Sequence, residues 1–294
     1  MVNEVSGFID KNRITAQMGR VINMSERIFV ITGGAQGLGY GLASTFASMG
    51  ARICIADLNE QGAVDAAKLL SKDCMADVIG IGTDVSDEES VRKMVLGTVK
   101  HFGGLDVMVA CAGINIAGAL PDISKSVFEK VNAVNYTGYF LCAKYASEVM
   151  KEQRALDPNR MYDIIEINSK SGLQGSNANF VYAGSKFGGI GLTQSFALEL
   201  APYGIKVNAV CPGNLLDGPM WNDPEHGILK QYLEAGKVPG AKTVEDVRAH
   251  YESKVPLGGC CRPEDIARAV KYVIEQQYET GQAVPVTGGQ VMLK

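Results

Sequence analysis

Residues 27–39 read RIFVITGGAQGLG, an apolar, β-branched run that leads straight into a glycine-rich turn. The run predicts a buried strand, and the apolar residues of 37–49 have the spacing of a helix. Glycines in such a turn let the backbone bend tightly and approach a pyrophosphate, while the helix N-terminus offers free N–H groups to the anion. The stretch therefore predicts a strand–turn–helix unit that binds a dinucleotide.

The spacing of the glycines narrows the kind of loop. They follow a G-x-x-x-G-x-G pattern, which differs from the common G-x-G-x-x-G fingerprint, and no Gly-Lys-Ser/Thr follows as in a Walker loop. The alternative is a glycine-rich turn that binds no ligand. On the dinucleotide interpretation, the loop residues predicted to contact the cofactor are Gly33, Gln36, Gly37, Leu38 and Gly39.

An aspartate closes the next apolar run. Asp57 follows the run at 51–56, twenty residues after Gly37. A carboxylate there can accept hydrogen bonds from the ribose hydroxyls and would repel a 2′-phosphate. Because the glycine loop contains no Arg or Lys, the sequence predicts NAD rather than NADP. Asp57 could also be the N-cap of the helix that starts near Asn59, and both roles could hold together.

The rest of the chain alternates between apolar runs and segments with helical spacing. Runs bounded by glycine or aspartate predict strands at 27–32, 51–56, 78–82, 105–111, 162–168, 205–211 and 283–286. Helical spacing predicts helices at 37–49, 59–72, 87–102, 124–153, 181–202 and 263–277. Repeated β-α-β units with nearly continuous apolar strands are typical of a parallel sheet covered on both faces. We therefore predict one α/β domain over 25–294, a doubly wound Rossmann-type sheet of about seven strands.

Two segments fall outside this alternation. Residues 214–252 contain Gly, Pro, Trp, His and scattered charge. That is long for a loop in a compact domain, so we predict a substrate lid with short helices of its own. Residues 1–24 precede the first strand without a clear period and form an N-terminal extension, which could be an ordered arm, a flexible tail or a misassigned start.

Composition excludes several classes of function. The chain has 294 residues, is 46% hydrophobic and carries a net charge of −4 without a basic block, which argues against nucleic acid or a membrane surface as partner. Its seven cysteines lack C-x-x-C spacing, which fits reduced thiols, and its three histidines are too dispersed for a metal site. No secretory signal or apolar run of transmembrane length is visible. We therefore expect a cytoplasmic protein that holds no metal.

A tyrosine and a lysine four residues apart form the second informative motif. Tyr182 and Lys186 lie in a predicted helix, where positions i and i+4 share a face. A cation held beside a phenol favours the phenolate, so the pair could supply a general base near neutral pH. Ser169 lies thirteen residues before the tyrosine. Alone, the pair could also be a chance feature of a surface helix.

Taken together, these motifs resemble the short-chain dehydrogenase/reductase family over about residues 26 to 294. The resemblance is carried, in chain order, by Thr32–Gly39, Asp84-Val85, Cys111-Ala112-Gly113, Asn135, Ser169, Tyr182-x-x-x-Lys186 and Pro212-Gly213. The chain departs from the family at Cys111, where asparagine is usual and stabilises the central strand. Members are usually dimers or tetramers packed through two long helices, here 124–153 and 181–202, and the C-terminal region, so the resemblance implies a homo-oligomer such as a homotetramer.

The resemblance also implies roles for individual residues. Tyr182 would be the general base in alcohol oxidation, and Lys186 would favour its phenolate and bind the nicotinamide ribose. Ser169 would donate a hydrogen bond to the substrate oxygen, with Ser171 as an alternative on the same loop. Asn135 would hold a water that links Lys186 to solvent, unless it is a satisfied core amide. Further NAD contacts would come from Asp84, Val85, Ala112, Gly113, Pro212 and Gly213, with Tyr182 and Lys186 themselves.

Several longer segments resemble sorbitol-6-phosphate 2-dehydrogenases within this family. They are 167–172, 186–195, 213–216, 254–257 and 286–292. This resemblance implies an NAD-dependent oxidoreductase that interconverts a polyol phosphate and a ketose phosphate, sorbitol 6-phosphate and fructose 6-phosphate. A phosphate needs cationic or amide anchors, and the candidates are Lys170, Ser171 and Asn214, with His226, Lys230, Lys237 and Lys242 in the lid.

Two other functions remain open at this stage. One is a different carbonyl reductase of the same fold, acting on an unphosphorylated polyol or a 3-oxoacyl substrate. No basic patch suited to an acyl carrier is obvious around the predicted cleft. The other is a dinucleotide sensor without turnover, which the presence of Tyr182, Lys186, Ser169 and Asn135 disfavours.

Overall fold

The computed structural model of the chain describes residues 1–16 and 23–292. Its centre is a seven-stranded sheet in the order β3-β2-β1-β4-β5-β6-β7, and every neighbouring pair is parallel. The strands are β1 (Ile28–Thr32), β2 (Arg52–Asp57), β3 (Val78–Gly82), β4 (Val107–Ala110), β5 (Tyr162–Ile167), β6 (Ile205–Pro212) and β7 (Ala283–Val286). The predicted doubly wound sheet is confirmed.

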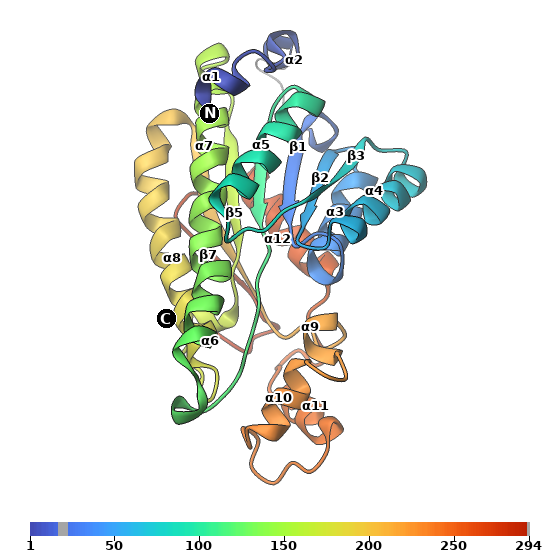
Figure 1. Cartoon of the computed structure of the whole chain (residues 1–294), viewed down its shortest axis with the longest axis vertical. Coiled ribbons are helices and arrows are strands. Elements are labelled where there is room, and N and C mark those ends of the chain that lie inside the picture. The colour runs from blue at the N-terminus through green and yellow to red at the C-terminus, as the bar shows by residue number, and fades with distance from the viewer. Residues whose placement is uncertain (17–22, 293–294) are drawn as a thin grey trace.

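Helices cover both faces of the sheet (Figure 1). One face packs against α3 (Gly37–Ser48), α4 (Glu60–Cys74) and α12 (Pro263–Glu275). The other packs against α5 (Glu88–Phe102), α7 (Gly138–Leu156) and α8 (Phe180–Leu200). Successive strand residues alternate between the two cores, which is why strands buried on both sides read as continuous apolar runs.

The helix predicted at 124–153 is wrong as a single α-helix. It consists of α6 (Lys125–Asn132), the π-helical turn η3 (Ala133–Thr137) and α7. In η3 the Gly138 N–H donates to the carbonyl of Ala133, five residues earlier instead of four. A side chain at Gly138 would lie 2.9 Å from Val85, so the wider turn falls where the helix approaches the loop after β3 most closely. Asn135 lies inside this turn.

The segment predicted as a lid contains three short helices, α9 (Pro219–Asn222), α10 (Ile228–Glu234) and α11 (Val244–Ser253). Figure 1 shows α10 and α11 beyond the sheet, at the end of the molecule opposite α1 and α2. The segment has a small core of its own, made by Leu216, Ile228, Leu229, Tyr232, Val238, Val247 and Tyr251. Trp221 packs edge-on against Tyr232 and Tyr251. The aromatic residues that distinguish 214–252 from the β-α alternation thus pack into the core of this segment.

The N-terminal residues 1–16 form an arm that contains α1 (Val2–Val5) and α2 (Lys11–Ala16). It packs on α5 and α7, and Val5 and Ile14 are fully buried in the core. Of the predicted extension 1–24, residues 17–22 lie outside the described part, and the short turn η1 (Met24–Glu26) precedes β1. The remaining 3-10 turns are η2 (Leu120–Asp122), η4 (Lys170–Gly172) and η5 (Ala201–Tyr203).

Within 1–16 and 23–292, no helix is long and apolar enough to cross a membrane. The same residues contain no cluster of His, Cys, Asp and Glu able to hold a metal ion.

Candidate active site

The glycine loop joins β1 to α3 at the carboxyl end of the sheet. Gly33 and Gly37 have φ angles of 64° and 57°, which glycine adopts readily. A side chain at Gly33 would meet the Ala112 backbone at 2.9 Å, and one at Gly39 would overlap the Gly33 carbonyl. Gln36 occupies the N-cap of α3, but no side chain caps the helix. The first turn of α3 therefore presents uncapped N–H groups beside a glycine-rich backbone, which fits a pyrophosphate.

Asp57 is held at the end of β2, next to this loop. Its carboxylate accepts hydrogen bonds from the N–H groups of Ala35 and Asn59, both at 3.0 Å. The N-cap of α4 is Asn59, whose side chain accepts from Gly62. The suggestion that Asp57 is itself the N-cap is therefore wrong, because α4 begins at Glu60, two residues later than that role requires. Asp57 instead fastens the glycine loop to β2.

Thr32 ties the loop after β4 to the glycine loop. Its hydroxyl oxygen accepts hydrogen bonds from the N–H groups of Cys111 and Ala112, both at 3.0 Å. The position where the family usually has asparagine is therefore anchored through the backbone in this chain. Gly113 follows, and a side chain there would touch the amide of Asn135.

The other predicted cofactor residues border the same end of the sheet. The Asp84 carboxylate accepts from the N–H and hydroxyl of Ser86, in the turn that leads to α5. Val85 is buried against Gly138, so its side chain belongs to the core. Pro212 ends β6, and the Gly213 N–H donates to the carbonyl of Val286.

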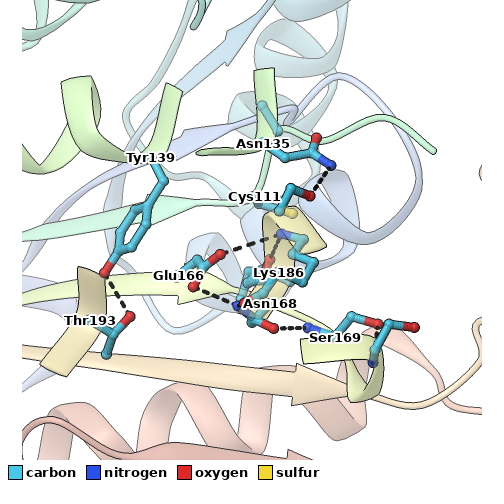
Figure 2. Close-up of polar contacts among 12 residues, drawn as sticks. Cys111, Asn135, Tyr139, Glu166, Asn168, Ser169, Lys186 and Thr193 are labelled. Carbon is cyan, nitrogen blue, oxygen red and sulfur yellow. Dashed lines mark hydrogen bonds and ion pairs between the residues drawn. The ribbon is translucent and has the colours of Figure 1, made fainter. Parts of the chain in front are cut away.

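Asn168 links Ser169, which follows β5, to Lys186 on α8 (Figure 2). The Ser169 hydroxyl oxygen accepts from the Ser171 N–H at 3.1 Å, which leaves its own proton available to donate. The Lys186 ammonium donates to the carbonyl of Ile167 at 2.7 Å and is almost fully buried. Tyr182 lies one helical turn before Lys186 and is half-buried. Ser171 is thus a support for Ser169 through its backbone.

The Asn135 side chain is engaged by protein groups. Its amide donates to the carbonyl of Ile114 at 2.9 Å and to the Ser185 hydroxyl at 3.1 Å, and its oxygen accepts from the Ile114 N–H. Both amide donors are therefore used. A water contact at this position would have to come from the remaining oxygen lone pair or from the backbone of η3.

Three lysines converge where the lid meets η4. The Lys170 and Lys254 ammoniums lie 5.4 and 5.3 Å from the centre of the Tyr251 ring. Lys237 lies 3.8 Å from the Tyr232 ring and donates to the Ser176 hydroxyl. Partial burial and the nearby ammonium of Lys254 lower the pKa of Lys170 to about 7 and that of Lys237 to about 8.

Among the described residues none of these three lysines forms an ion pair with a carboxylate, and the lowered pKa values of Lys170 and Lys237 mean that a bound anion would favour the protonated forms. The sequence suggested Lys170 and Lys237 but missed Lys254, and its expectation that no basic patch borders the site is wrong because the three lysines gather only in the folded chain. The other lid candidates do not join it. His226 is exposed near Glu225, Lys230 pairs with Glu234, and Lys242 faces solvent.

The side-chain amides of Asn115, Asn179 and Asn214 have buried polar atoms, and of these residues the sequence suggested only Asn214. Asn179 donates to the Tyr232 hydroxyl at 2.9 Å, while its own oxygen has no partner among the described residues. Neither side-chain polar atom of Asn214, nor the oxygen of Asn115, has one either. Buried polar atoms are rarely left unpaired, so these amides fit a polar ligand.

The chain belongs to the short-chain dehydrogenase/reductase family, since residues 27–226 match the family described as short chain dehydrogenase. It is an oxidoreductase that acts on CH–OH groups, and the family implies NAD(P) as the cofactor. The glycine loop, the bare N-terminus of α3 and the free amide of Asn214 fit such a group.

Relatives of known name lie within this family. The chain is 38% identical to sorbitol-6-phosphate 2-dehydrogenase of Escherichia coli K12, over 90% of this chain and 99% of the relative. It resembles the crystal structure of sorbitol-6-phosphate 2-dehydrogenase SrlD from Erwinia amylovora with a TM-score of 0.82 and 37% identity, over 90% of this chain and all of that one. Levodione reductase follows with a TM-score of 0.80 and 27% identity, over 92% and 98%.

Proposed function

We propose that the chain is an NAD-dependent dehydrogenase that interconverts a polyol phosphate and a ketose phosphate, sorbitol 6-phosphate and fructose 6-phosphate. The observation that carries the phosphate is the lysine cluster of Lys170, Lys237 and Lys254, which gathers around the rings of Tyr232 and Tyr251. A polyol 6-phosphate presents a dianion at one end and hydroxyls at the other. The identities of the relatives point the same way.

The residues proposed to transfer protons are Ser169, which follows β5, and Tyr182 and Lys186 on α8. Tyr182 takes the proton from the substrate hydroxyl, and the buried Lys186 ammonium beside it stabilises the phenolate. Ser169 donates its hydroxyl proton to the substrate oxygen, because its own oxygen is already occupied by the Ser171 N–H. The nicotinamide, when bound, accepts the hydride. Asn115, Asn179 and Asn214 are suited to hold the remaining hydroxyls or the carboxamide edge.

NAD is the proposed form of the cofactor. The Asp57 carboxylate is fixed by Ala35 and Asn59 at the end of β2, where the adenosine ribose binds in such folds. A fixed negative charge accepts the ribose hydroxyls and repels a 2′-phosphate. The preference is measured as the ratio of kcat/KM with NAD to that with NADP. A ratio below one would overturn this part of the proposal.

The chemistry is tested by removing one hydroxyl. Tyr182→Phe should lose at least about 100-fold in kcat, because a general base contributes roughly that much or more, while NAD binding measured by fluorescence titration stays unchanged. A Tyr182→Phe enzyme with wild-type turnover would refute the proposed mechanism.

The phosphate is tested by charge removal. Lys170→Met and Lys254→Met should each raise KM for sorbitol 6-phosphate by about 10-fold or more, the loss of one charge-assisted contact, and leave KM for unphosphorylated sorbitol unchanged. Lys242→Met, an exposed lid lysine, is the matched control. Equal wild-type activity on sorbitol and its phosphate would favour an unphosphorylated polyol instead, and no turnover with any alcohol would favour a sensor.

A homo-oligomer through α7 and α8 is also proposed. Tyr136, Phe140 and Phe187 expose 37%, 41% and 47% of their surface, and Leu198 exposes 82%. These exposed apolar side chains, of Tyr136 in η3, Phe140 in α7, and Phe187 and Leu198 in α8, are suited to contact with a second copy of the chain. Sedimentation of the wild type and of Phe187→Glu tests it, since a charge in the interface should dissociate the oligomer.

A further inference from the structure

Glu166 is a buried carboxylate that the proposed chemistry does not use. It occupies β5, three residues before Ser169, and only 1% of its surface is exposed. One oxygen accepts from the Asn168 amide at 2.7 Å, and the other lies 3.6 Å from the Lys186 ammonium (Figure 2). Asn168 in turn donates to the carbonyl of Lys186 and accepts from the Ser169 N–H. The carboxylate is thus connected to Ser169 and to Lys186.

Glu166 supplies the negative charge beside Lys186. The other titratable groups packed around the pair are Tyr182 on α8, Tyr139 and Cys142 on α7, Cys111 after β4 and Cys211 on β6. Burial raises the pKa of each of these three thiols to about 12 and that of Tyr139 well above its ordinary value, so they stay neutral. Burial opposes the charge of both partners and raises the pKa of Glu166, whereas the Glu166 carboxylate outweighs burial at Lys186 and raises the lysine pKa. The separation of 3.6 Å between the two groups favours the charged pair.

The fold keeps space for this carboxylate. Gly189 of α8 packs against it, and a methyl group at that position would overlap the Glu166 carboxylate. Glu166 and Lys186 also line a cavity of about 10 Å³ with Asn135 and Thr32. The Glu166 oxygen that faces Lys186 has no hydrogen-bond partner among the described residues. A polar cavity of this size can accommodate about one water molecule between such groups.

We propose that Glu166 is a positioning residue for the active site, the counter-ion that keeps Lys186 protonated beside Tyr182 and so sets the pH range in which the enzyme oxidises its substrate. The inference rests on the proposed roles of Tyr182 and Lys186. It does not depend on which polyol is the substrate.

The direction of the effect follows from charge. Oxidation needs the Tyr182 phenolate, so kcat/KM rises with pH on the acidic side and falls where Lys186 loses its proton. Glu166→Gln removes the negative charge beside Lys186. Without that charge the lysine lowers the pKa of the Tyr182 phenol more strongly, and the pKa of Lys186 itself falls. Both limbs of the profile should move to lower pH, by about one pH unit or more for a buried charge at this separation.

The experiment compares kcat/KM against pH for wild type and Glu166→Gln, using whichever alcohol the wild type oxidises fastest. Gly189→Ala, which crowds the carboxylate away from Lys186, should shift the profile in the same direction by a smaller amount. Gly191→Ala is its matched control, because a methyl group there meets nothing within 4 Å. Its profile should coincide with that of the wild type.

The outcomes separate this inference from the proposed function. Profiles of Glu166→Gln and Gly189→Ala that coincide with the wild type, while Tyr182→Phe is inactive, would overturn only the role of Glu166. A Tyr182→Phe enzyme with full turnover would overturn the proposed chemistry itself. A fall in kcat at every pH without any shift of the limbs would identify Glu166 as a merely structural residue and also overturn the inference. Where Glu166→Gln does not fold, the shift of Gly189→Ala decides.

Discussion

Two buried carboxylates lie at opposite ends of the same sheet and differ in how completely they are paired. Asp106 precedes β4 at the amino end and is fully buried. Its oxygens accept hydrogen bonds from Arg13 at 2.9 Å, from Arg160 at 2.8 Å and from the Ile28 N–H at 2.9 Å. Glu166 at the carboxyl end is equally buried, yet only one of its oxygens has a hydrogen-bond partner among the described residues.

The difference indicates two uses of a buried charge. Asp106 joins the N-terminal arm, β1 and the segment before β5, and its arginine partners cannot lose their protons. Glu166 lies beside Lys186, and a lysine can lose its proton. A carboxylate saturated by arginine holds elements together, whereas one that is half-paired beside a lysine can adjust the charge of a reaction site.

The largest expected effect is on stability at the amino end. Asp106→Asn removes the carboxylate that two buried guanidiniums share, which should cost about 3–5 kcal/mol of unfolding free energy. Urea denaturation of the wild type, Asp106→Asn and the exposed control Asp122→Asn measures it. Activity per folded molecule should not change. A loss no larger than that of the control would refute the structural role of Asp106.

The ion pairs of Asp106 with Arg13 and Arg160 also determine how the stability of the fold responds to acid. Burial alone would raise the pKa of Asp106, but the guanidiniums of Arg13 and Arg160 outweigh it and hold the pKa well below its ordinary 3.8. A carboxyl with a depressed folded pKa stabilises the fold above its unfolded pKa, and that stability is lost as the pH falls below it. The stability gap between wild type and Asp106→Asn should therefore be constant above about pH 5 and narrow below about pH 4.

A smaller loss of stability is expected at the carboxyl end. Glu166→Gln keeps the hydrogen bond from Asn168 and leaves Lys186 able to release its proton, so it should cost about 1–3 kcal/mol. The measurement is again urea denaturation at pH 7. A cost equal to that of Asp106→Asn would mean that the two carboxylates are equivalent and would remove the contrast between them.

The smallest expected effect concerns Gly189 of α8, which leaves room for the Glu166 carboxylate. Gly191→Ala should stabilise the protein by about 1 kcal/mol, because alanine favours a helix and its methyl group meets nothing. Gly189→Ala should lose that gain, since the methyl group displaces the carboxylate. Thermal unfolding of both variants measures the difference. Equal stabilisation by both substitutions would show that Gly189 is not required for the charge.

Much of the fold follows from local patterns. The predicted strands at 78–82 and 283–286 coincide with β3 and β7, because β-branched residues between turn formers define both ends. The helix predicted at 124–153 differs from the observed structure because it contains a π-helical turn. This turn lies next to the close approach of Gly138 and Val85, a contact between distant segments that helical periodicity cannot predict.

The candidate site divides in the same way. The glycine loop, Asp57, Ser169 and the pair of Tyr182 and Lys186 are short-range motifs whose spacing is visible along the chain. Lys254 and Asn179 were missed, since each is one polar residue among many until the lid folds against η4. Glu166 was missed because nothing in the strand sequence YDIIEI distinguishes it from the other acidic residue, Asp163, until the fold places Lys186 beside it.

The sequence by itself determined the parallel α/β architecture and the motifs that meet at the carboxyl ends of its strands, since hydrophobic period, turn chemistry and motif spacing are local properties. Only the tertiary structure decided which charges are paired. Three lysines from separate segments meet without a carboxylate, Asp106 meets two arginines, and Glu166 meets one lysine with an oxygen to spare. Pairing depends on distances of a few ångströms between residues far apart in the chain, which no local pattern specifies.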